Sequence, residues 1–335
     1  MNVMKFHTVL AIGFVFMALA ACKKKDKEET PLKNSLSGTM TFSMPAYVGK
    51  NIPIALTPVG VKHPTGALGY YWTVSWSTKR DTTKLEKGTG DGTFAFRTPR
   101  TVGTYTVSCI AFAEGYYTSS GIRTFSVVDA TPDSTLTDLG INRVSDPKFT
   151  DPRDGRTYYT ATVGGKVWTR TNLGYAGSGI SYEGCTVMDP LFGRLYTWKE
   201  AVKACPAGWH LPSDADWAAL GSALSGASFA AGDVLKGVSG SLMTNARFMD
   251  KRMWEFWPKV KITNKSGLGV IPVGYASDRG DSYRYVGFND YAAFWTADTK
   301  ETNGVYRYVY VSNPDVLVGY GDQESFLASV RCVKD

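Results

Sequence analysis

The sequence has few of the side chains on which most enzyme chemistry depends. Only three of its 335 residues are histidine and five are cysteine. His7 lies in an apolar N-terminal stretch, which leaves His63 and His210 for acid–base or metal chemistry. None of the strings H-E-x-x-H, C-x-x-C, G-x-S-x-G or G-x-x-x-x-G-K-[ST] occurs, so the usual signals of metalloproteases, redox dithiols, serine hydrolases and P-loop proteins are missing. We therefore expect no enzyme activity, no metal and no cofactor.

Long hydrophobic runs are also scarce, and the only membrane-like stretch is at the N-terminus. Residues 9–21 form an apolar run of 13 residues that follows Lys5. Such a run is too short to span a bilayer and is typical of a secretory signal. It ends in Leu19-Ala20-Ala21-Cys22, which resembles the lipobox of bacterial lipoproteins. We predict a signal peptide over residues 1–21 and lipidation of Cys22; the alternative is an ordinary signal with a chance cysteine.

Residues 22–37 are strongly charged and begin with Lys23-Lys24-Lys25 after the predicted lipid cysteine. This composition does not pack into a core and predicts a solvated tether. A mixed lysine and acidic run at this place also resembles the export signals of surface-exposed lipoproteins of Bacteroidetes. The resemblance implies an outer-membrane protein that is held to the membrane by its lipid anchor and faces the cell exterior.

The formal net charge of +7 does not indicate nucleic-acid binding. The tether alone supplies five lysines against three acidic residues, and Lys5 leaves with the signal peptide. The remainder of the chain has no dense stripe of lysine and arginine, which is the usual electrostatic footprint of nucleic-acid binding. We exclude nucleic acid as a partner.

Residues 38–129 alternate in short strand-like runs separated by turns, which predicts a β-sandwich. The second half of this segment contains Pro99, Gly103 and a Tyr105-Thr106-Val107 strand. This pattern resembles the polycystic-kidney-disease (PKD) type of immunoglobulin-like module. The resemblance implies that Tyr105 forms a tyrosine corner, that Trp72 is the core tryptophan of the opposite sheet, and that the domain acts as a spacer.

A linker and a second domain follow. Residues 130–148 are polar and without periodicity, which predicts an interdomain linker. Residues 149–335 open with an expected pair of β-hairpins, with two-residue turns at Asp154-Gly155 and Gly164-Gly165. Apolar residues at helical spacing then predict one helix that includes Leu195 to Cys205. A second helix is expected to begin directly after Pro212, with a capping box from Ser213 to Asp216.

The C-terminal domain carries a resemblance in five blocks that occur in order. The blocks are "DPRDGRTYYTATVGGKVWTRTNLGY", "GRLYTWKEAVKACPAGWHLPSDADWAALGSAL", "NKSGLGVIPVGYASDRG", "AAFWTAD" and "SVRCVKD". Together they resemble the Fibrobacter succinogenes major paralogous (FISUMP) domain, a family common in surface and secreted proteins of Bacteroidetes and Fibrobacteres. That family in turn resembles the C-type lectin-like fold. The expected fold class is therefore mostly β with a smaller α+β part: an immunoglobulin-like β-sandwich followed by an α+β C-type lectin-like domain.

The four cysteines other than Cys22 allow three pairings in an oxidising compartment. Lectin-like domains link the end of the first helix to the last strand, so the resemblance implies a disulfide between Cys205 and Cys332. Cys109 and Cys185 then remain as buried free thiols. The alternative role for Cys205 is a catalytic thiol, with His210 as the only base in the domain.

The calcium-dependent sugar site of that fold is not implied here. Asn313-Pro314-Asp315 follows a strand and is interpreted as a turn. Trp295-Thr296-Ala297 stands where a calcium-binding lectin has Trp-Asn-Asp, and it offers no carboxylate ligand. The aromatic cluster of Trp254, Phe256 and Trp257 is either a sugar-stacking platform or, as we prefer, part of the core.

The candidate ligand site lies in the segment from Ser277 to Asp290, interpreted as a loop hinged at Gly280 and Gly287. Tyrosine rings there offer flat apolar contact area, and aspartate and arginine offer hydrogen bonds, a combination that suits sugar rings or peptide. The candidate residues are Asp278, Arg279, Asp281, Tyr283, Arg284 and Tyr285. A solvated loop without a ligand is the alternative, and the Arg-Gly-Asp string within it receives little weight.

Two functions remain open. The first is a surface-exposed lipoprotein that presents a lectin-like module for non-catalytic binding of a glycan or protein ligand. The second is a structural or fimbria-associated component of the cell envelope, whose lectin-like domain packs against partner subunits. An enzyme comes third: formylglycine-generating enzymes resemble the same fold, but they need a reactive cysteine pair, and a disulfide better explains the pair here.

Overall fold

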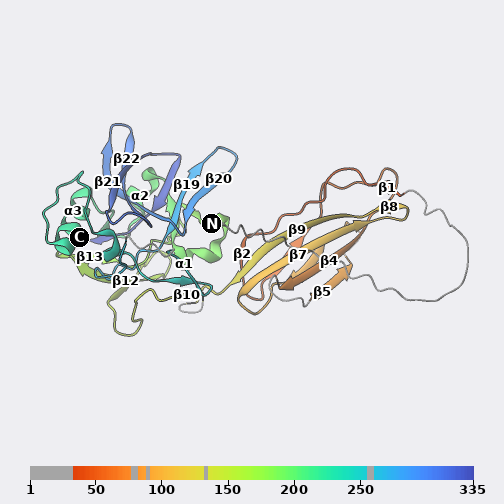
Figure 1. Cartoon of the computed structure of the whole chain (residues 1–335), viewed down its shortest axis with the longest axis horizontal. Helices are drawn as coiled ribbons and strands as arrows, with labels where there is room; N and C mark the ends of the chain where they lie inside the picture. Colours follow the sequence, from red (N-terminus) through yellow and green to blue (C-terminus); the bar gives the residue numbers. More distant parts are fainter. Residues whose placement is uncertain (1–32, 77–81, 88–90, 132–134, 255–259) are drawn as a thin grey trace, which may run out of the picture.

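The computed structural model describes residues 33–335 except 77–81, 88–90, 132–134 and 255–259, and the predicted signal peptide and Cys22 lie outside the described residues. Strands predominate strongly over helices, so the expected fold class, mostly β with a smaller α+β part, is confirmed. An elongated β domain joins end to end with a rounder domain that holds the helices (Figure 1). In this described part, no helix is both long and apolar enough to cross a membrane.

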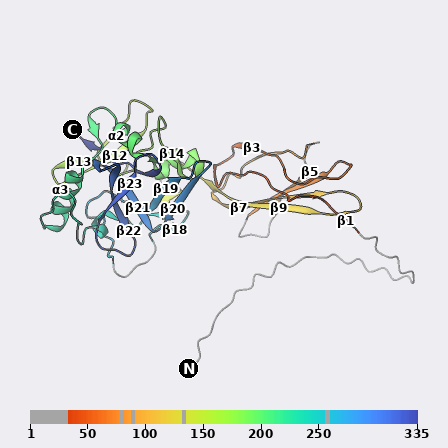
Figure 2. The ribbon, with the colours of Figure 1, turned by 90° about the horizontal axis from the view of Figure 1, so that it is seen from above.

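The N-terminal domain is a sandwich of two sheets. One sheet has the strand order β2-β9-β7-β4-β5, and the second consists of β3 and β6. Figure 2 shows β3 on one side of this domain and β7 with β9 on the other. The strands are β1 (Asn34–Ser35), β2 (Tyr47–Gly49), β3 (Pro53–Leu56), β4 (Gly69–Trp76), β5 (Thr82–Lys87), β6 (Phe94–Arg97), β7 (Gly103–Phe112), β8 (Tyr116–Tyr117) and β9 (Ser119–Val128).

Trp72 and Tyr105, the two residues expected to mark this core, are both buried in it, but they lie on the paired strands β4 and β7 of one sheet and not on opposite sheets. Trp72 is fully buried between the sheets, and its indole N–H donates to the carbonyl oxygen of Gly92 at 2.8 Å. The Tyr105 hydroxyl donates to the carbonyl oxygen of Thr101 at 2.9 Å, four residues upstream, which is the contact of a tyrosine corner. Burial of such large rings accounts for the packing of the two sheets.

The segment predicted as the interdomain linker packs onto the C-terminal domain. Within residues 130–148, β10 (Leu136–Thr137) pairs with β17 (Arg247–Phe248), and Leu136 and Leu139 are buried. These two leucines add apolar surface to an otherwise polar segment, and this surface is buried against the domain.

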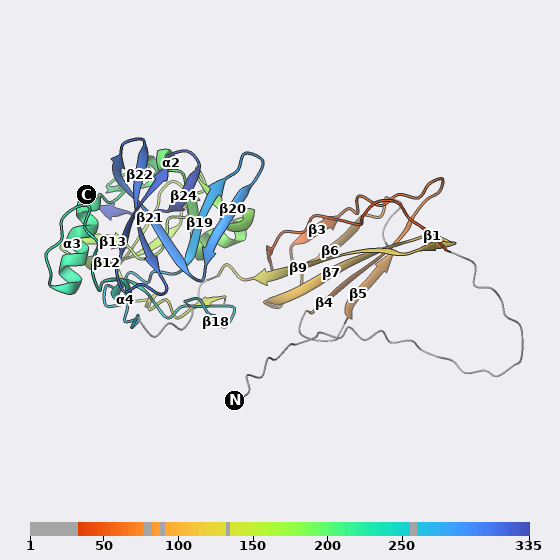
Figure 3. The same cartoon turned by 45° about the horizontal axis from the view of Figure 1, so that its top comes forward.

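The C-terminal domain contains two main sheets, with the strand orders β11-β12-β13-β25-β16 and β14-β15-β24-β19-β21-β22-β23. Strand β20 pairs with the outer side of β19, and β10-β17-β18 form a small third sheet. Figure 3 shows β19 to β22 side by side. The remaining strands are β11 (Lys148–Thr150), β12 (Thr157–Val163), β13 (Lys166–Thr169), β14 (Ile180–Ser181), β15 (Arg194–Tyr196), β16 (Trp209–His210), β18 (Lys251–Arg252), β19 (Val273–Asp278), β20 (Tyr283–Phe288), β21 (Tyr291–Lys300), β22 (Asn303–Tyr310), β23 (Leu317–Asp322), β24 (Phe326–Ser329) and β25 (Val333–Lys334).

The helices follow the sequence signals with one correction. The helical segments are η1 (Tyr182–Gly184), η2 (Thr186–Met188), α1 (Asp189–Phe192), α2 (Trp198–Ala204), α3 (Asp214–Ser225) and α4 (Ser239–Leu242). Ser213 caps α3 in a capping box with Asp216, as expected. The first predicted helix is shorter than expected, because Leu195 belongs to β15, where it pairs with Ser329 of β24. Thr197 caps α2 instead.

The predicted hairpin turns give one confirmation and one correction. Gly164-Gly165 connects β12 directly to β13. Asp154-Gly155 lies inside a longer connection, residues 151–156, between β11 and β12. This longer loop is held by Asp151, whose buried carboxylate accepts hydrogen bonds from the side chain and backbone N–H of Arg153. A side-chain anchor of this kind replaces the tight backbone turn.

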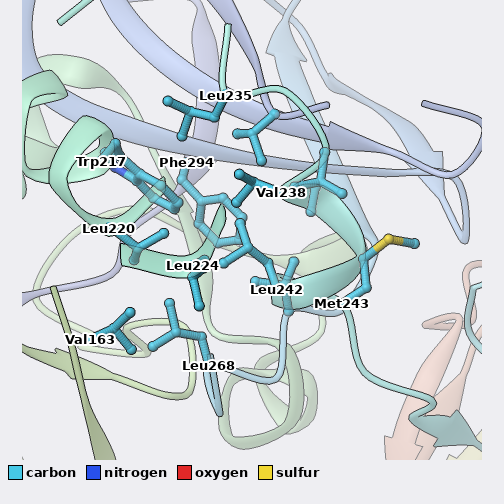
Figure 4. Close-up of a cluster of buried hydrophobic side chains, with 14 of the residues drawn as sticks. Val163, Trp217, Leu220, Leu224, Leu235, Val238, Leu242, Met243, Leu268 and Phe294 are labelled. Atoms are coloured by element: carbon cyan, nitrogen blue, oxygen red, sulfur yellow. The ribbon is translucent and has the colours of Figure 1, made fainter. Parts of the chain in front are cut away.

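The core of the C-terminal domain lies between α3 and the long sheet. Trp217, Leu220 and Leu224 of α3 point toward Phe294 of β21, and α4 contributes Leu242 (Figure 4). These positions follow the helical repeat of α3, so one face of the helix is buried. The opposite face of the long sheet carries a second cluster of side chains, which is rich in tyrosine.

Candidate functional site

The candidate ligand segment is a β-hairpin and not a loop. Residues Ser277–Asp278 end β19, Tyr283 begins β20, and the register pairs Asp278 with Tyr283. Only residues 279–282 form the turn, in which the Asp278 carboxylate accepts from the N–H of Gly280 at 2.8 Å. Gly280 has φ +85°, a conformation that glycine adopts without strain. β-Branched and aromatic residues beyond this turn favour strand pairing over a loop.

The hairpin divides the candidate residues between its tip and its two faces. Arg279, Asp281, Tyr283 and Arg284 are exposed, and Asp278 is half-buried. Because strand residues alternate between faces, Arg284 shares a face with Val286 and Tyr275. The six candidates therefore do not converge on a single pocket.

Tyr285 faces the interior of the domain. Its hydroxyl donates to the carbonyl oxygen of Ser181 at 2.9 Å and accepts from the N–H of Gly184 at 3.2 Å. Its ring lies 5.3 Å from that of Tyr182, between centroids. Both hydrogen-bonding functions of this hydroxyl are thus occupied within the fold. Tyr285 holds the hairpin against η1 and is a structural residue in this conformation.

A hollow of about 330 Å³ lies on the sheet face that Arg284 shares. We call it the tyrosine hollow. It is lined by Tyr275, Val286, Gly287, Asp290, Tyr291, Tyr306, Tyr310 and Phe326. These residues come from β19, β20, β21, β22 and β24 and from the short turn before β21. Its volume falls within the range of small-molecule binding sites.

The rings of the hollow contact one another in a continuous series. Tyr275 lies 5.0 Å from Phe326, and Phe326 lies 4.7 Å from Tyr306, measured between ring centroids. Tyr275 also lies 5.4 Å from Tyr291. These separations are those of stacked and edge-to-face aromatic pairs. The result is a partly exposed aromatic surface on a sheet, where the backbone pairing restricts its movement.

Two glycines of β23 make this arrangement possible. A Cβ atom at Gly319 would lie 2.2 Å from Cζ of Tyr306, and one at Gly321 would lie 2.7 Å from a ring carbon of Phe326. Neither distance is compatible with a side chain. The rings of Tyr306 and Phe326 therefore lie directly against the backbone of β23.

The polar groups of the hollow are hydroxyls and one carboxylate. The pKa of Tyr291 is raised above its ordinary value, mainly by burial and to a smaller extent by the neighbouring Tyr306. The Tyr291 hydroxyl hydrogen-bonds to that of Tyr306. Burial likewise raises the pKa of Tyr306, so both phenols remain protonated. Among the described residues that line the hollow, Asp290 is the only charged one. The site can therefore stack apolar ring faces and hydrogen-bond to hydroxyl groups.

A comparison with known protein families finds a match that includes every residue of the tyrosine hollow. The family model described as the Fibrobacter succinogenes major domain matches residues 161–334, just over half of the chain. The chain belongs to this family. The resemblance inferred from the five sequence blocks is thus confirmed. Among curated proteins, the chain has no significant match.

The Fibrobacter succinogenes major domain contains the predicted disulfide. Cys205, directly after α2, is bonded to Cys332, directly before β25, and their Cα atoms are 5.8 Å apart. This pairing leaves no thiol at Cys205 for catalysis. Cys109 and Cys185 are free and buried, as expected. Burial raises the pKa of the Cys109 thiol to about 12, so it is not a reactive thiolate.

Other predicted positions of the domain have structural roles. Trp254 is fully buried, and its indole N–H donates to the carbonyl oxygen of Val270, so it belongs to the core; Phe256 and Trp257 lie outside the described residues. Residues 313–315 form a turn in which the Asp315 N–H donates to Oδ1 of Asn313 at 2.9 Å. In the described ranges, no three His, Cys, Asp or Glu side chains are grouped to hold a metal ion.

The tyrosine hollow is the part of the domain that sequence reasoning missed. Its best signal is the alternation of Tyr306, Tyr308 and Tyr310, which places three rings on one face of a strand. That alternation indicates a shared face but does not indicate which other strands lie beside it. Three residues of the candidate segment, Val286, Gly287 and Asp290, also line the hollow, and Asp290 is the charged one among them.

Proposed function

We propose that the Fibrobacter succinogenes major domain of this protein binds carbohydrate, without catalysis, in the tyrosine hollow. The observation that carries the proposal is the contiguous series of aromatic rings beside a single carboxylate, Asp290. Sugar rings present apolar C–H faces that pack on aromatic rings and hydroxyl groups that hydrogen-bond to carboxylates and phenols. Arg284, on the same face of the neighbouring hairpin, extends the polar edge of the site.

The proposed lectin-like ancestry of the family supports the same conclusion. The C-type lectin-like fold, which this family resembles, has a loop-rich ligand side, and the hollow lies on the sheet face away from α3. The calcium mechanism is not part of the proposal. Thr296, at the position of a calcium ligand, is buried and donates its hydroxyl to the carbonyl oxygen of Val305 at 3.1 Å. Binding is therefore expected to persist in the presence of a calcium chelator.

A glycan array probed with the full-length protein tests this proposal, followed by titration of the glycans that bind. Tyr310 is the most exposed ring of the hollow at 41 %, so Tyr310→Ala removes contact area with little effect on folding. We expect a roughly three- to tenfold weaker affinity. Tyr320→Ala is the matched control, because Tyr320 is 48 % exposed on the neighbouring strand and lies on the opposite face.

The outcomes separate the two candidate places on the domain. Loss of binding in Tyr310→Ala with no change in Tyr320→Ala supports the hollow. Loss in Asp281→Ala and Tyr283→Ala, with Tyr310→Ala unchanged, places the ligand at the hairpin tip that the sequence suggested. An array without any bound glycan contradicts carbohydrate binding altogether.

We also propose that the protein is a lipoprotein of the outer membrane that faces the cell exterior. The support is the Leu19-Ala20-Ala21-Cys22 string after an apolar run, followed by a charged segment. In this arrangement the N-terminal sandwich acts as a spacer. Its elongated shape, with the C-terminal domain at the far end from β1, suits that role (Figure 1).

A structural role in the envelope is the second candidate, and one observation favours it. The outer face of the N-terminal sheet exposes Tyr71, Ile110 and Ile122, at 42 %, 37 % and 59 %. These residues lie on neighbouring strands and form an apolar surface of the kind that packs against a protein partner. This alternative predicts that Ile122→Asp, and not Tyr310→Ala, abolishes a chemical crosslink to a second envelope protein on intact cells.

A further inference from the structure

A separate cavity of about 460 Å³ lies where the segment 130–148 crosses the C-terminal domain. One wall is apolar and is formed by side chains of this segment and of α1. The members of this wall are Ala130, Leu136, Leu139, Ile141, Pro190 and Leu191. The other wall is polar and contains Arg156 and Asp189. None of these residues lines the tyrosine hollow.

Arg156 lines this cavity and carries one buried hydrogen-bond donor without a partner. Its Nε lies 3.3 Å from Asp154, and its Nη2 lies 3.8 Å from Asp189. Its Nη1 is buried and has no hydrogen-bond partner among the described residues. A Cβ atom at Gly174 would lie 2.5 Å from Nη1, so the absence of a side chain at Gly174 leaves the space in which the guanidinium lies.

Asp189 presents a buried acceptor beside it. The residue is only 3 % exposed, and its Oδ2 accepts from Nη1 of Arg194 at 2.7 Å. Its Oδ1 has no hydrogen-bond partner within the described ranges. Buried polar atoms without partners are rare in folded proteins because they lose their hydration without compensation.

The described part of the chain has four buried side-chain polar atoms without a hydrogen-bond partner, and Nη1 of Arg156 and Oδ1 of Asp189 are two of them. The other two are the indole nitrogens of Trp168 and Trp217, which lie in the core between α3 and the sheets. Arg156 and Asp189, each with one unpartnered buried atom, thus line one cavity of ligand size. The lining carries three cationic side chains, Arg143, Lys148 and Arg156, against one carboxylate, so it favours an anion.

We propose that this cavity binds a small organic carboxylate that carries a hydroxyl or amino group next to its carboxylate. The ligand carboxylate accepts from Nη1 of Arg156, and the neighbouring O–H or N–H donates to Oδ1 of Asp189. The carbon skeleton of the ligand packs on the leucine-lined wall. Open-chain sugar acids and amino acids share this chemistry. The inference does not depend on the proposed function of the tyrosine hollow, because the two sites have no residue in common.

Isothermal titration calorimetry of the full-length protein with matched pairs of probes tests the ligand chemistry. D-Galactonate is compared with galactitol, which lacks the carboxylate, and L-leucine with 4-methylpentanoate, which lacks the amino group. We expect one of the two acids to bind with a stoichiometry of one and its matched compound to bind at least tenfold more weakly. Binding of galactonate alone identifies a sugar acid, and binding of leucine alone identifies an amino acid. The absence of binding by both acids overturns the proposal.

Substitutions test the place of binding. Loss of a charge-assisted hydrogen bond in Arg156→Gln is expected to weaken binding roughly 10- to 100-fold. Gly174→Ala is expected to act in the same direction, because its new Cβ displaces the guanidinium while the backbone there is not left-handed. Arg252→Gln is the control, since Arg252 is exposed on β18 and outside the cavity.

Thermal unfolding of each variant shows whether it retains its fold. If Arg156→Gln does not fold, Gly174→Ala decides the result. Unchanged affinity in a folded Arg156→Gln or Gly174→Ala variant, or an equal loss in Arg252→Gln, contradicts binding at this cavity. Tyr310→Ala is expected to leave the affinity for the acid unchanged, which distinguishes this site from the hollow.

Discussion

Arg307 of β22 and Asp214 in the first turn of α3 form a fully buried ion pair with two hydrogen bonds. Nε of Arg307 lies 2.5 Å from Oδ1 of Asp214, and Nη2 lies 2.7 Å from Oδ2. Arg307 alternates along its strand with Tyr306 and Tyr308, which face the other side of the sheet. The pair therefore fixes α3 behind the strand that presents the tyrosine hollow.

Breaking this pair is expected to destabilise the domain strongly. Asp214→Ala leaves the Arg307 guanidinium buried without a counter-charge, which costs roughly 3–5 kcal/mol in the free energy of unfolding. Urea unfolding followed by circular dichroism measures the change. Glu324→Gln is the control, because the Lys199–Glu324 pair is 59 % and 72 % exposed and is worth less than about 1 kcal/mol. Similar losses in both variants would contradict a special role for the buried pair.

The Cys205–Cys332 disulfide closes a long loop, with a sequence separation of 127 residues. Removing it by the double substitution Cys205→Ser and Cys332→Ser is expected to lower the free energy of unfolding by roughly 2–5 kcal/mol, because the unfolded chain gains conformational freedom. Denaturant unfolding measures the loss, and Cys185→Ala is the control. Peptide mapping of the non-reduced protein is expected to link these two cysteines. A link from Cys185 to either of them shows the pairing to be different.

Gly319→Ala is expected to weaken carbohydrate binding without removing any side chain of the hollow. Its Cβ would lie 2.2 Å from Cζ of Tyr306, so the ring must move out of the contiguous series. Gly177→Ala is the matched control, since its Cβ would meet the ring of Tyr175, which lies outside the hollow. Titration of a glycan identified on the array measures both variants. Equal affinities in the two variants would mean that the position of the Tyr306 ring does not matter.

The Cys109 thiol is expected to make stability depend on pH in the alkaline range. Burial raises its pKa in the folded protein from 9.0 to about 12. The unfolded chain then loses its proton first, so the thiol's contribution is fully present below pH 9 and is lost as the pH rises toward 12. Urea unfolding from pH 7 to 11 is compared between the wild type and Cys109→Ala. The stability difference between them is expected to shrink above pH 9, and a constant difference contradicts the raised pKa.

Cys22→Ser is expected to release the protein from the membrane. The prediction rests on the small residues that precede Cys22 at the end of the apolar run. Palmitate labelling and fractionation of cells measure the effect, and Cys185→Ser is the control that keeps its label. Unchanged labelling of Cys22→Ser rules out this cysteine as the lipidation site.

Local signals determined several elements correctly because they depend on neighbouring residues only. Ser213 and Asp216 form the capping box that begins α3, and Gly164-Gly165 forms the turn between β12 and β13. A cap satisfies N–H groups of its own first turn, and a two-residue turn needs only its own backbone angles. The spacing of Leu195 fits a helical repeat and predicts a helix, but pairing with Ser329, far away in the chain, places it in a strand.

The sequence by itself determined the family, the mostly β character and which residues of each strand share a face. Only the tertiary structure decided the two candidate sites. Alternation placed Tyr306 and Tyr310 on one face, but the order β24-β19-β21-β22 brought Phe326, Tyr275 and Tyr291 beside them. Strand order is set by burial across the whole sheet, which no short segment encodes. The contact between Arg156 and Asp189 at the wall of the second cavity arises in the same way, because residues of the segment 130–148 line that cavity beside both.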